Sequence, residues 1–355
     1  MAGDVQSGVS ARERFLAAAS CQPVDCTPVW FMRQAGRCLA EYRALREKYD
    51  ILTMTRTPDL CSQVTLMPVE TFGVDAAVMY ADIMLPLYAL ELAFSIDPGI
   101  GPIVPEPVRT MADVGRLAGT DPRQAVSFLY EAMRMVRSSL GDSTALVGFA
   151  GGPFTIASYM VEGKPSREFP FAKGLIYREP AVWHALMERV TAVTIPYLEG
   201  QIEAGADAIQ LFDSWAGSLS AQTYEKHVLP YTGRIVDAVR GHHVPVIHFS
   251  TGSTHLTGLV ASTGVEVISV DWREKLSTVA SGLSRPVCLQ GNLDPAVVLG
   301  THSFIEEEAR RVLDDARELP GHIFNLGHGV LAETPSENLA FLARRVHELS
   351  ARVPA

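Results

Sequence analysis

The sequence predicts a single-domain α/β protein with the (β/α)8 TIM-barrel fold. Eight short apolar runs of strand character lie at residues 27–32, 75–80, 145–150, 206–212, 244–249, 265–271, 286–290 and 322–326. Helical stretches separate the runs, and this alternation indicates parallel βαβ units. The runs are continuously apolar, as expected when both faces of a parallel sheet are covered. Eight such units favour a closed barrel. An open doubly wound sheet is the alternative, but no G-x-G-x-x-G motif follows the first run.

The stretches between the runs predict the helices and loops of this barrel. The clearest helical stretches are residues 56–72, 122–140, 178–204, 221–240, 294–317 and 336–350. Residues 97–120, rich in Pro and Gly, predict a long excursion, and residues 160–172 predict an irregular loop over the barrel mouth. Both connections are long for a compact domain, which indicates function. Residues 1–10 predict a disordered N-terminus, which leaves residues 11–355 for the barrel.

The first apolar run ends abruptly in a short polar turn. The residues of this turn are Arg33, Gln34, Ala35, Gly36 and Arg37. A guanidinium is planar, always charged and able to bind a carboxylate or phosphate with two hydrogen bonds. The turn therefore predicts an anion-binding rim. The alternative is a surface turn whose arginines pair with Glu41 or Glu47.

Polar residues also follow the other runs. In chain order they are Asp82; Gly151, Gly152 and Tyr159; Asp213 and Ser214; His248 and Ser250; Asp271 and Arg273; Gln290 and Asn292; and His328. The carboxyl ends of barrel strands carry the active sites of such folds. We therefore expect these side chains to converge on one cleft.

Taken as single residues, four of these positions have both a functional and a structural interpretation. Asp82 lies among apolar residues, so it is either a partly desolvated carboxylate or the cap of the next helix. Glycines flank His328, which lets the backbone approach a ligand; a turn histidine bonded to backbone is the alternative. Tyr159 and Ser214 would by default be a core tyrosine and a capping serine.

Composition limits the class of partner and the compartment. The net charge is −10, which argues against nucleic acid or an anionic membrane as the main partner. The start of the chain lacks the apolar core of a signal peptide, and no run reaches the length of a membrane helix. The five cysteines show no close paired spacing. A reduced, cytoplasmic protein is the simple expectation.

Several long motifs resemble one known family, uroporphyrinogen decarboxylase. Residues 28–43 resemble its N-terminal signature, with Cys38 where the family usually has Tyr and Ala40 where it has Pro. Residues 148–159 resemble its second signature. The likeness continues through Tyr80-Ala-Asp82-Ile, Leu211-Phe-Asp-Ser214-Trp and Gly327-His328-Gly329, and so covers nearly the whole chain.

The resemblance implies a distorted (β/α)8 barrel that converts uroporphyrinogen III to coproporphyrinogen III with loss of four CO₂. It implies no cofactor and a homodimer, and Ser250 in place of a possible thiolate ligand predicts that no metal is bound. Its implied catalytic residues are Asp82, Arg33, Tyr159 and His328. Substrate binding would also involve residues 34–37 and Ser214. Asp82 would stabilise a cationic pyrrole, the arginines and His328 would hold carboxylates, and Arg33 is a candidate proton donor.

Two other functions stay open at this point. Some related methyltransferases carry His-x-Cys at a strand end and bind zinc, whereas this chain has His248 and Ser250 there. A thiolate-ligated zinc site therefore looks absent, which argues against a zinc- or corrinoid-dependent methyltransferase. A non-catalytic tetrapyrrole-binding protein is the alternative from a different class.

Overall fold

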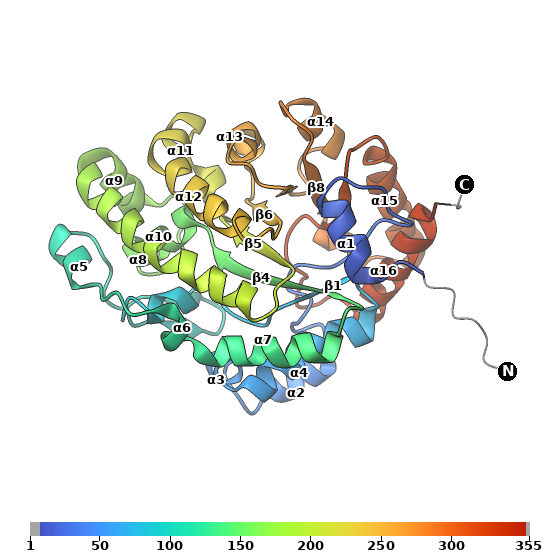
Figure 1. Cartoon of the computed structure of the whole chain (residues 1–355), viewed down its shortest axis with the longest axis horizontal. Helices are drawn as coiled ribbons and strands as arrows, with labels where there is room; N and C mark the ends of the chain where they lie inside the picture. The colour runs from blue at the N-terminus through green and yellow to red at the C-terminus, as the bar shows by residue number, and fades with distance from the viewer. Residues whose placement is uncertain (1–7, 353–355) are drawn as a thin grey trace.

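A parallel sheet curls through the centre of the molecule, with helices around it (Figure 1). The computed structural model describes residues 8–352, so most of the predicted disordered segment 1–10 lies outside the described residues. The sheet has seven strands in the order β1-β4-β5-β6-β7-β8-β9, and every neighbouring pair is parallel. The strands are β1 Ala76–Val78, β4 Ala145–Gly151, β5 Ala208–Phe212, β6 Val246–Phe249, β7 Val267–Ser269, β8 Cys288–Leu293 and β9 His322–Leu326. The predicted barrel and seven of its eight strand positions are therefore confirmed.

The first predicted strand, residues 27–32, is not a regular strand, and this prediction was wrong. Only Val29 forms an isolated bridge, to Phe324 of β9. The segment nevertheless lies between β9 and β1. The Phe324 N–H donates to the carbonyl of Pro28 at 2.8 Å, and the Asp75 N–H donates to the carbonyl of Val29 at 2.8 Å. The barrel is therefore closed, but through an irregular eighth position.

Side chains explain why the eighth position is irregular. The Val29 N–H donates to the carboxylate of Asp75 (2.7 Å), the Phe31 N–H to the amide oxygen of Gln34 (3.0 Å), and the Met32 N–H to that of Asn325 (3.0 Å). Buried N–H groups need partners. Because side chains supply them here, a strand ladder does not form.

Helices separate the strands and cover the sheet. They are α1 Ala11–Ala19, α2 Ala40–Arg46, α3 Ile51–Arg56, α4 Pro58–Phe72, α5 Met111–Arg116, α6 Pro122–Ala125, α7 Ser127–Leu140, α8 Pro153–Glu162, α9 Pro170–Arg178, α10 Pro180–Glu203, α11 Ala221–His227, α12 Leu229–Arg240, α13 Thr257–Ser262, α14 Leu276–Ser281, α15 His302–Asp315 and α16 Ser336–Ser350. Short 3₁₀ turns η1–η4 occupy Leu85–Tyr88, Ala216–Ser218, Thr254–Leu256 and Pro295–Leu299.

Three predicted helices are interrupted. Residues 122–140 divide into α6 and α7, and residues 221–240 divide into α11 and α12. In the second case Pro230 lies at the start of α12, where a residue without an N–H can begin a helix but not continue one. The stretch 294–317 begins as a 3₁₀ turn at Pro295 and becomes helical only at His302. The described part of the chain has no helix long and apolar enough to cross a membrane.

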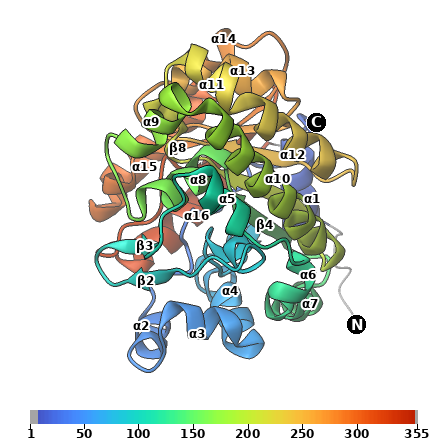
Figure 2. The same cartoon turned by 90° about the vertical axis from the view of Figure 1, so that its left-hand side faces the viewer.

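The predicted excursion after the second unit contains an antiparallel hairpin, β2 Ser95–Asp97 with β3 Gly101–Ile103. Figure 2 shows this hairpin projecting from the body beside α2 and α3. The Val104 and Val108 N–H groups donate to the carbonyls of Gly163 and Met160, both at 2.8 Å. These bonds fasten the excursion to the end of α8. The irregular loop over the barrel mouth spans residues 163–169, between α8 and α9, and is therefore shorter than the predicted residues 160–172.

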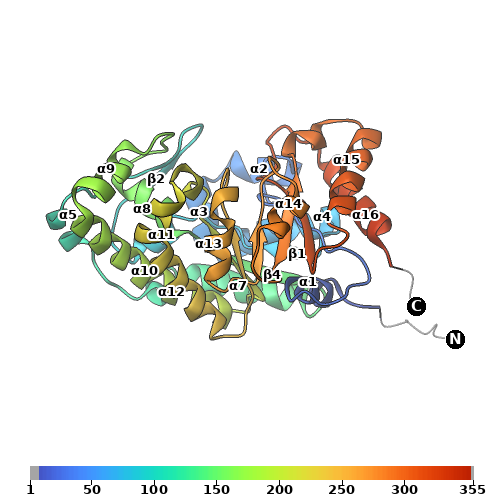
Figure 3. The same ribbon diagram turned by 90° about the horizontal axis from the view of Figure 1, so that it is seen from above.

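Helices α1 and α16, which lie near the two ends of the described chain, meet at the seam where residues 27–32 close the barrel. Asp75 is 1% exposed. It accepts from Arg14 of α1 and from His347 of α16, both at 2.6 Å. The Thr27 N–H donates to the hydroxyl of Ser350 at 2.8 Å, and the Arg352 N–H to the carbonyl of Asp25 at 2.7 Å. In Figure 3, α1 lies on the edge of the molecule opposite α2.

Candidate active site

A cleft of about 480 Å³ opens at the carboxyl ends of the strands. Seven of the predicted site residues line it: Arg33, Ala35, Gly36, Arg37, Asp82, Tyr159 and Ser214. They come from the turn after residues 27–32, from the segments that follow β1 and β5, and from α8, so residues far apart in the sequence meet in one place. This arrangement is the convergence that the barrel fold predicts.

Arg33 and Arg37 form the charged rim of the cleft. Both side chains are exposed, and neither makes an ion pair within residues 8–352. The alternative of surface arginines paired with Glu41 or Glu47 is therefore not observed. Two guanidiniums without partners at a cleft suit an anionic ligand.

The position of Arg33 depends on a glycine. Arg33 has a left-handed backbone, with φ 60°, and its aliphatic stem lies against Gly329. A Cβ on Gly329 would come within 2.5 Å of Arg33 Cδ. Only glycine leaves the stem in this place.

Gln34, predicted to bind substrate, does not line the cleft. Its side chain is fully buried. The amide oxygen accepts from the Phe31 N–H, and the amide nitrogen donates to the carbonyl of Ala76 at 2.9 Å. The side chain of Gln34 therefore holds the turn that carries the two arginines against β1.

Asp82 combines the two roles that the sequence left open. It is half-buried, and Oδ1 accepts from the Met84 N–H at 2.9 Å, as a cap would. Burial raises the pKa of this carboxyl, and the Met84 N–H and the charge of Arg33 act against that rise. Asp82 and Arg33 influence each other electrostatically but make no ion pair in the described chain, so a substrate can lie between them.

Tyr159 projects from α8, which follows β4. Its ring packs against that of Trp215, with centroids 4.2 Å apart. Burial raises the pKa of the hydroxyl, and the charge of Asp82 adds to the rise. Tyr159 therefore stays protonated and can donate a hydrogen bond into the cleft.

Ser214 lies at the end of β5, in the turn that follows the strand. Its carbonyl accepts from the N–H and the hydroxyl of Thr251, at 3.3 and 2.7 Å. The backbone is therefore held, while the side-chain hydroxyl has no partner among residues 8–352 and remains free for a ligand.

His328 is half-buried and lies beside the residues that line the cleft. Its ring centroid is 5.9 Å from that of Phe249. Burial lowers the pKa of the imidazole to about 4, and the charges of Arg33 and Arg273 add to this effect. His328 is therefore neutral near pH 7, so it can offer a substrate carboxylate one N–H but no charge.

Of the remaining strand-end residues, Arg273 is exposed and pairs with Asp271 at 2.9 Å, whereas Gln290 and Ser250 are buried and bonded within the protein. Gln290 accepts from the indole N–H of Trp30 (3.0 Å) and donates to Gln210 and Ser269 (3.1 and 3.0 Å). Ser250 accepts from the Gly217 N–H at 3.3 Å. No group of three or more His, Cys, Asp or Glu in the described chain is arranged to hold a metal ion.

Two tyrosines that were not predicted as site residues also line the cleft, Tyr42 of α2 and Tyr80. Their hydroxyls are 3.2 Å apart and share a hydrogen bond. Tyr80 could have been found from its position, because it follows the end of β1 and precedes Asp82 by two residues.

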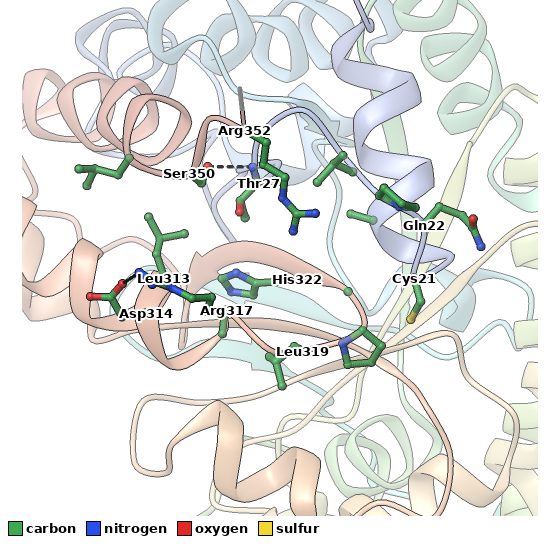
Figure 4. A pocket seen from close by; sticks show the side chains of 17 residues that line it. Cys21, Gln22, Thr27, Leu313, Asp314, Arg317, Leu319, His322, Ser350 and Arg352 are labelled. Atoms are coloured by element: carbon green, nitrogen blue, oxygen red, sulfur yellow. Dashed lines mark hydrogen bonds and ion pairs between the residues drawn. The ribbon is translucent and has the colours of Figure 1, made fainter. Parts of the chain in front are cut away.

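A second cavity of about 380 Å³ lies at the opposite, amino ends of the strands (Figure 4). His322, at the start of β9, lines it together with Arg317 and Arg352. Its polar groups are largely satisfied within the protein: Arg317 pairs with Asp314, and His322 is bonded to the carbonyl of Gly291 at 2.9 Å. None of the predicted site residues lies there.

Comparison with known proteins agrees with the geometry of the cleft. The family model described as uroporphyrinogen decarboxylase (URO-D) matches residues 10–349. A curated protein of that name from Roseiflexus sp. (strain RS-1) is 46% identical over 343 residues, which cover 95% of this chain and 99% of the relative. Another from Streptomyces coelicolor is 46% identical over 338 residues and covers 95% of each chain.

Solved structures show the same fold at lower identity. A methyltransferase from Methanosarcina mazei superimposes with a TM-score of 0.77 at 19% identity, covering 96% of this chain and 98% of its own. A B12-independent methionine synthase from Shewanella sp. W3-18-1 gives a TM-score of 0.54 at 11% identity, covering 82% and 87%. At these identities the likeness concerns the fold alone.

Proposed function

This chain belongs to the uroporphyrinogen decarboxylase family, and we propose that the cleft described above carries out the family's reaction. The chain is a carboxy-lyase that acts on a tetrapyrrole in porphyrin biosynthesis. The substrate is uroporphyrinogen III, whose four acetate arms become methyl groups with release of CO₂. Methyl transfer and non-catalytic binding are not favoured by the relatives.

One observation carries the assignment of roles: two guanidiniums that make no ion pair within residues 8–352 line the same cleft as a half-buried carboxylate. A substrate with many carboxylates and a ring that becomes cationic needs this distribution of charge. Arg33 and Arg37 hold carboxylate arms with bidentate hydrogen bonds. His328 and Ser214 add neutral donors, and Tyr159 adds another from α8.

The chemistry then needs no cofactor. A proton added to a pyrrole carbon makes the ring cationic. The bond from the acetate methylene to its carboxylate breaks, CO₂ leaves, and the electron pair moves into the ring. A second proton converts the methylene into a methyl group, and the ring returns the first proton. Asp82 stabilises the cationic ring, which is most effective in a water-poor site. Arg33 is a candidate proton donor, although a guanidinium is a weak acid.

The experiment is anaerobic incubation with uroporphyrinogen III, followed by chromatography of the oxidised porphyrins. We expect coproporphyrin to accumulate through species with seven, six and five carboxylates. Unchanged substrate that remains tightly bound would instead establish a non-catalytic binding protein.

We further propose a cytoplasmic homodimer without a bound metal. Light scattering that finds a fully active monomer at assay concentration would contradict the dimer. About one zinc per chain, removable only with loss of activity, would contradict the second part and favour the methyltransferase.

A further inference from the structure

Asp213 is a buried carboxylate to which the reaction above gives no task. It follows β5 directly, is 0% exposed, and its N–H donates to the carbonyl of Phe249 in β6 at 2.8 Å. Its Oδ2 is buried with no partner among the described residues. A buried carboxylate is costly unless it interacts favourably with its surroundings. The contacts of its other oxygen show what these interactions are.

Oδ1 of Asp213 accepts two hydrogen bonds from Thr155 in the first turn of α8. The Thr155 N–H and hydroxyl both donate at 2.8 Å. The helix has Gly152 at its own cap position and no cap from a side chain there. Asp213 therefore caps α8 from another strand, where the N–H groups and the helix dipole favour a negative charge.

The close approach of the two segments requires the glycine. A Cβ on Gly152 would lie 2.2 Å from the Cβ of Asp213. The Gly152 N–H also donates to the carbonyl of Phe212 at 2.9 Å. The start of α8 is therefore pressed against the end of β5.

Thr155 continues the connection into the cleft. The hydroxyl oxygen of Thr155 accepts a hydrogen bond from the backbone N–H of Trp215 at 3.2 Å. The Trp215 ring packs against Tyr159, which lies one helical turn after Thr155. Asp213, Thr155 and Trp215 are together called the Asp213 clamp. They link Tyr159 on α8 to Ser214, which lies between Asp213 and Trp215 in the turn after β5.

We infer that Asp213 is a positioning residue, which sets the hydroxyl of Tyr159 relative to Ser214 so that both reach one substrate. This inference rests on the proposed function. Burial raises the pKa of Asp213 to about 6, against the effect of the bonds from Thr155. The carboxylate is therefore charged near pH 7, which strengthens the two bonds that it accepts.

The test is the variant Thr155→Val, which keeps the shape of the side chain and removes the bridging hydroxyl. We expect kcat/KM for uroporphyrinogen III to fall by about 10- to 100-fold, the scale of a small misplacement of a reacting group. Thr155→Ser keeps the hydroxyl and should therefore retain most of the wild-type kcat/KM. The matched control is Thr194→Val on α10, which removes an equally buried hydroxyl bonded at 2.8 Å to the Val190 carbonyl; its kinetics should not change.

A double-mutant cycle shows whether the clamp acts through Tyr159. In a Tyr159→Phe background, Thr155→Val should cost little more, because coupled residues are not additive. Asp213→Asn keeps size but removes the charge, so it should lose about tenfold in the wild type and little in that background. It replaces Thr155→Val in the cycle if that variant does not fold.

Normal kinetics in Thr155→Val, or equal losses with and without the Tyr159 hydroxyl, would overturn the inference. Turnover of uroporphyrinogen III by the wild type tests the proposed function separately. The positioning role of the Asp213 clamp is tested only by the ratio of each variant's kcat/KM to that of the wild type.

Discussion

Replacing Asp82 with asparagine should separate its electrostatic role from its role as a cap. The amide oxygen of Asn can still accept the Met84 N–H bond, which is 2.9 Å in the wild type, because Asn and Asp are comparable caps. The variant should therefore fold and melt normally. It lacks the negative charge that would face the cationic ring.

The size of the loss follows from Coulomb's law. Two unit charges about 4 Å apart interact by about 4 kcal/mol at an effective dielectric constant of about 20. Each 1.36 kcal/mol corresponds to a factor of ten in rate, and the measured loss of one preorganised partner is about 10²–10³. We therefore expect turnover to fall by about 10²–10³.

The assay is CO₂ release together with thermal melting for the wild type, Asp82→Asn and a matched control. Asp294→Asn is the control, because Asp294 is also half-buried and caps the N–H two residues later, that of Ala296, at 2.9 Å. It does not line the cleft. An Asp82→Asn enzyme with normal melting and turnover within about threefold of the control would refute the electrostatic role.

Three further predictions test the rim and the buried histidines. Arg33→Lys and Arg37→Lys keep the charge but lose the bidentate geometry, so each should lower kcat/KM at least about tenfold; near-normal values in both would show that the arginines do not hold carboxylates. Gly329→Ala should displace the Arg33 stem and lower turnover about tenfold with little change in melting, whereas Gly233→Ala, with open space around it, should be neutral; equal activity of the two variants would contradict the contact. Burial lowers the pKa values of His248, His322 and His328 to about 4. Between about pH 4 and pH 6.5 the unfolded chain therefore binds more protons at these histidines than the folded chain does. The stability that the three neutral rings contribute above about pH 6.5 is lost as the pH falls toward 4. Asp213, whose pKa is raised to about 6, and Asp82, whose pKa burial also raises, oppose this trend. Two groups against three should still leave a falling melting temperature, and a constant one from pH 7 to 4.5 would contradict the burial of these rings.

Sequence periodicity predicted the interior strands because their environment is uniform. The run at β4, for example, is apolar throughout, since helices cover one face of the sheet and the barrel interior lies on the other. Residues 27–32 have the same pattern but a different backbone. Two of their three side-chain partners, Asp75 and Asn325, are far away in the sequence, so a local pattern could not have shown these bonds.

The candidate site was predicted unevenly for a similar reason. Residue type and strand-end position were enough to predict that Arg37, Asp82 and Ser214 line one cleft. They could not show that the side chain of Gln34 is hydrogen-bonded to the backbone of Phe31 and Ala76 and so does not reach the cleft. Nor could they show the bonds between Asp213 and Thr155. Such contacts depend on how two loops approach each other, which periodicity does not encode.

The seam at Asp75 has a consequence for the order of events during synthesis. Arg14 is among the first residues of the fold to leave the ribosome, and His347 is among the last, yet both bind the same carboxylate. The backbone of residues 27–32 also pairs with Phe324 of β9 and with Ser350 of α16, which are synthesised much later. The nascent chain can therefore build the units from β4 to β8 in sequence, but the ring closes only when β9 emerges, and the bonds of α16 complete the seam afterwards. Because α1 and α16 lie together at the seam, a circular permutant that joins the two ends and opens an exposed loop elsewhere would keep every contact of the seam and make the helices that form it consecutive in the sequence.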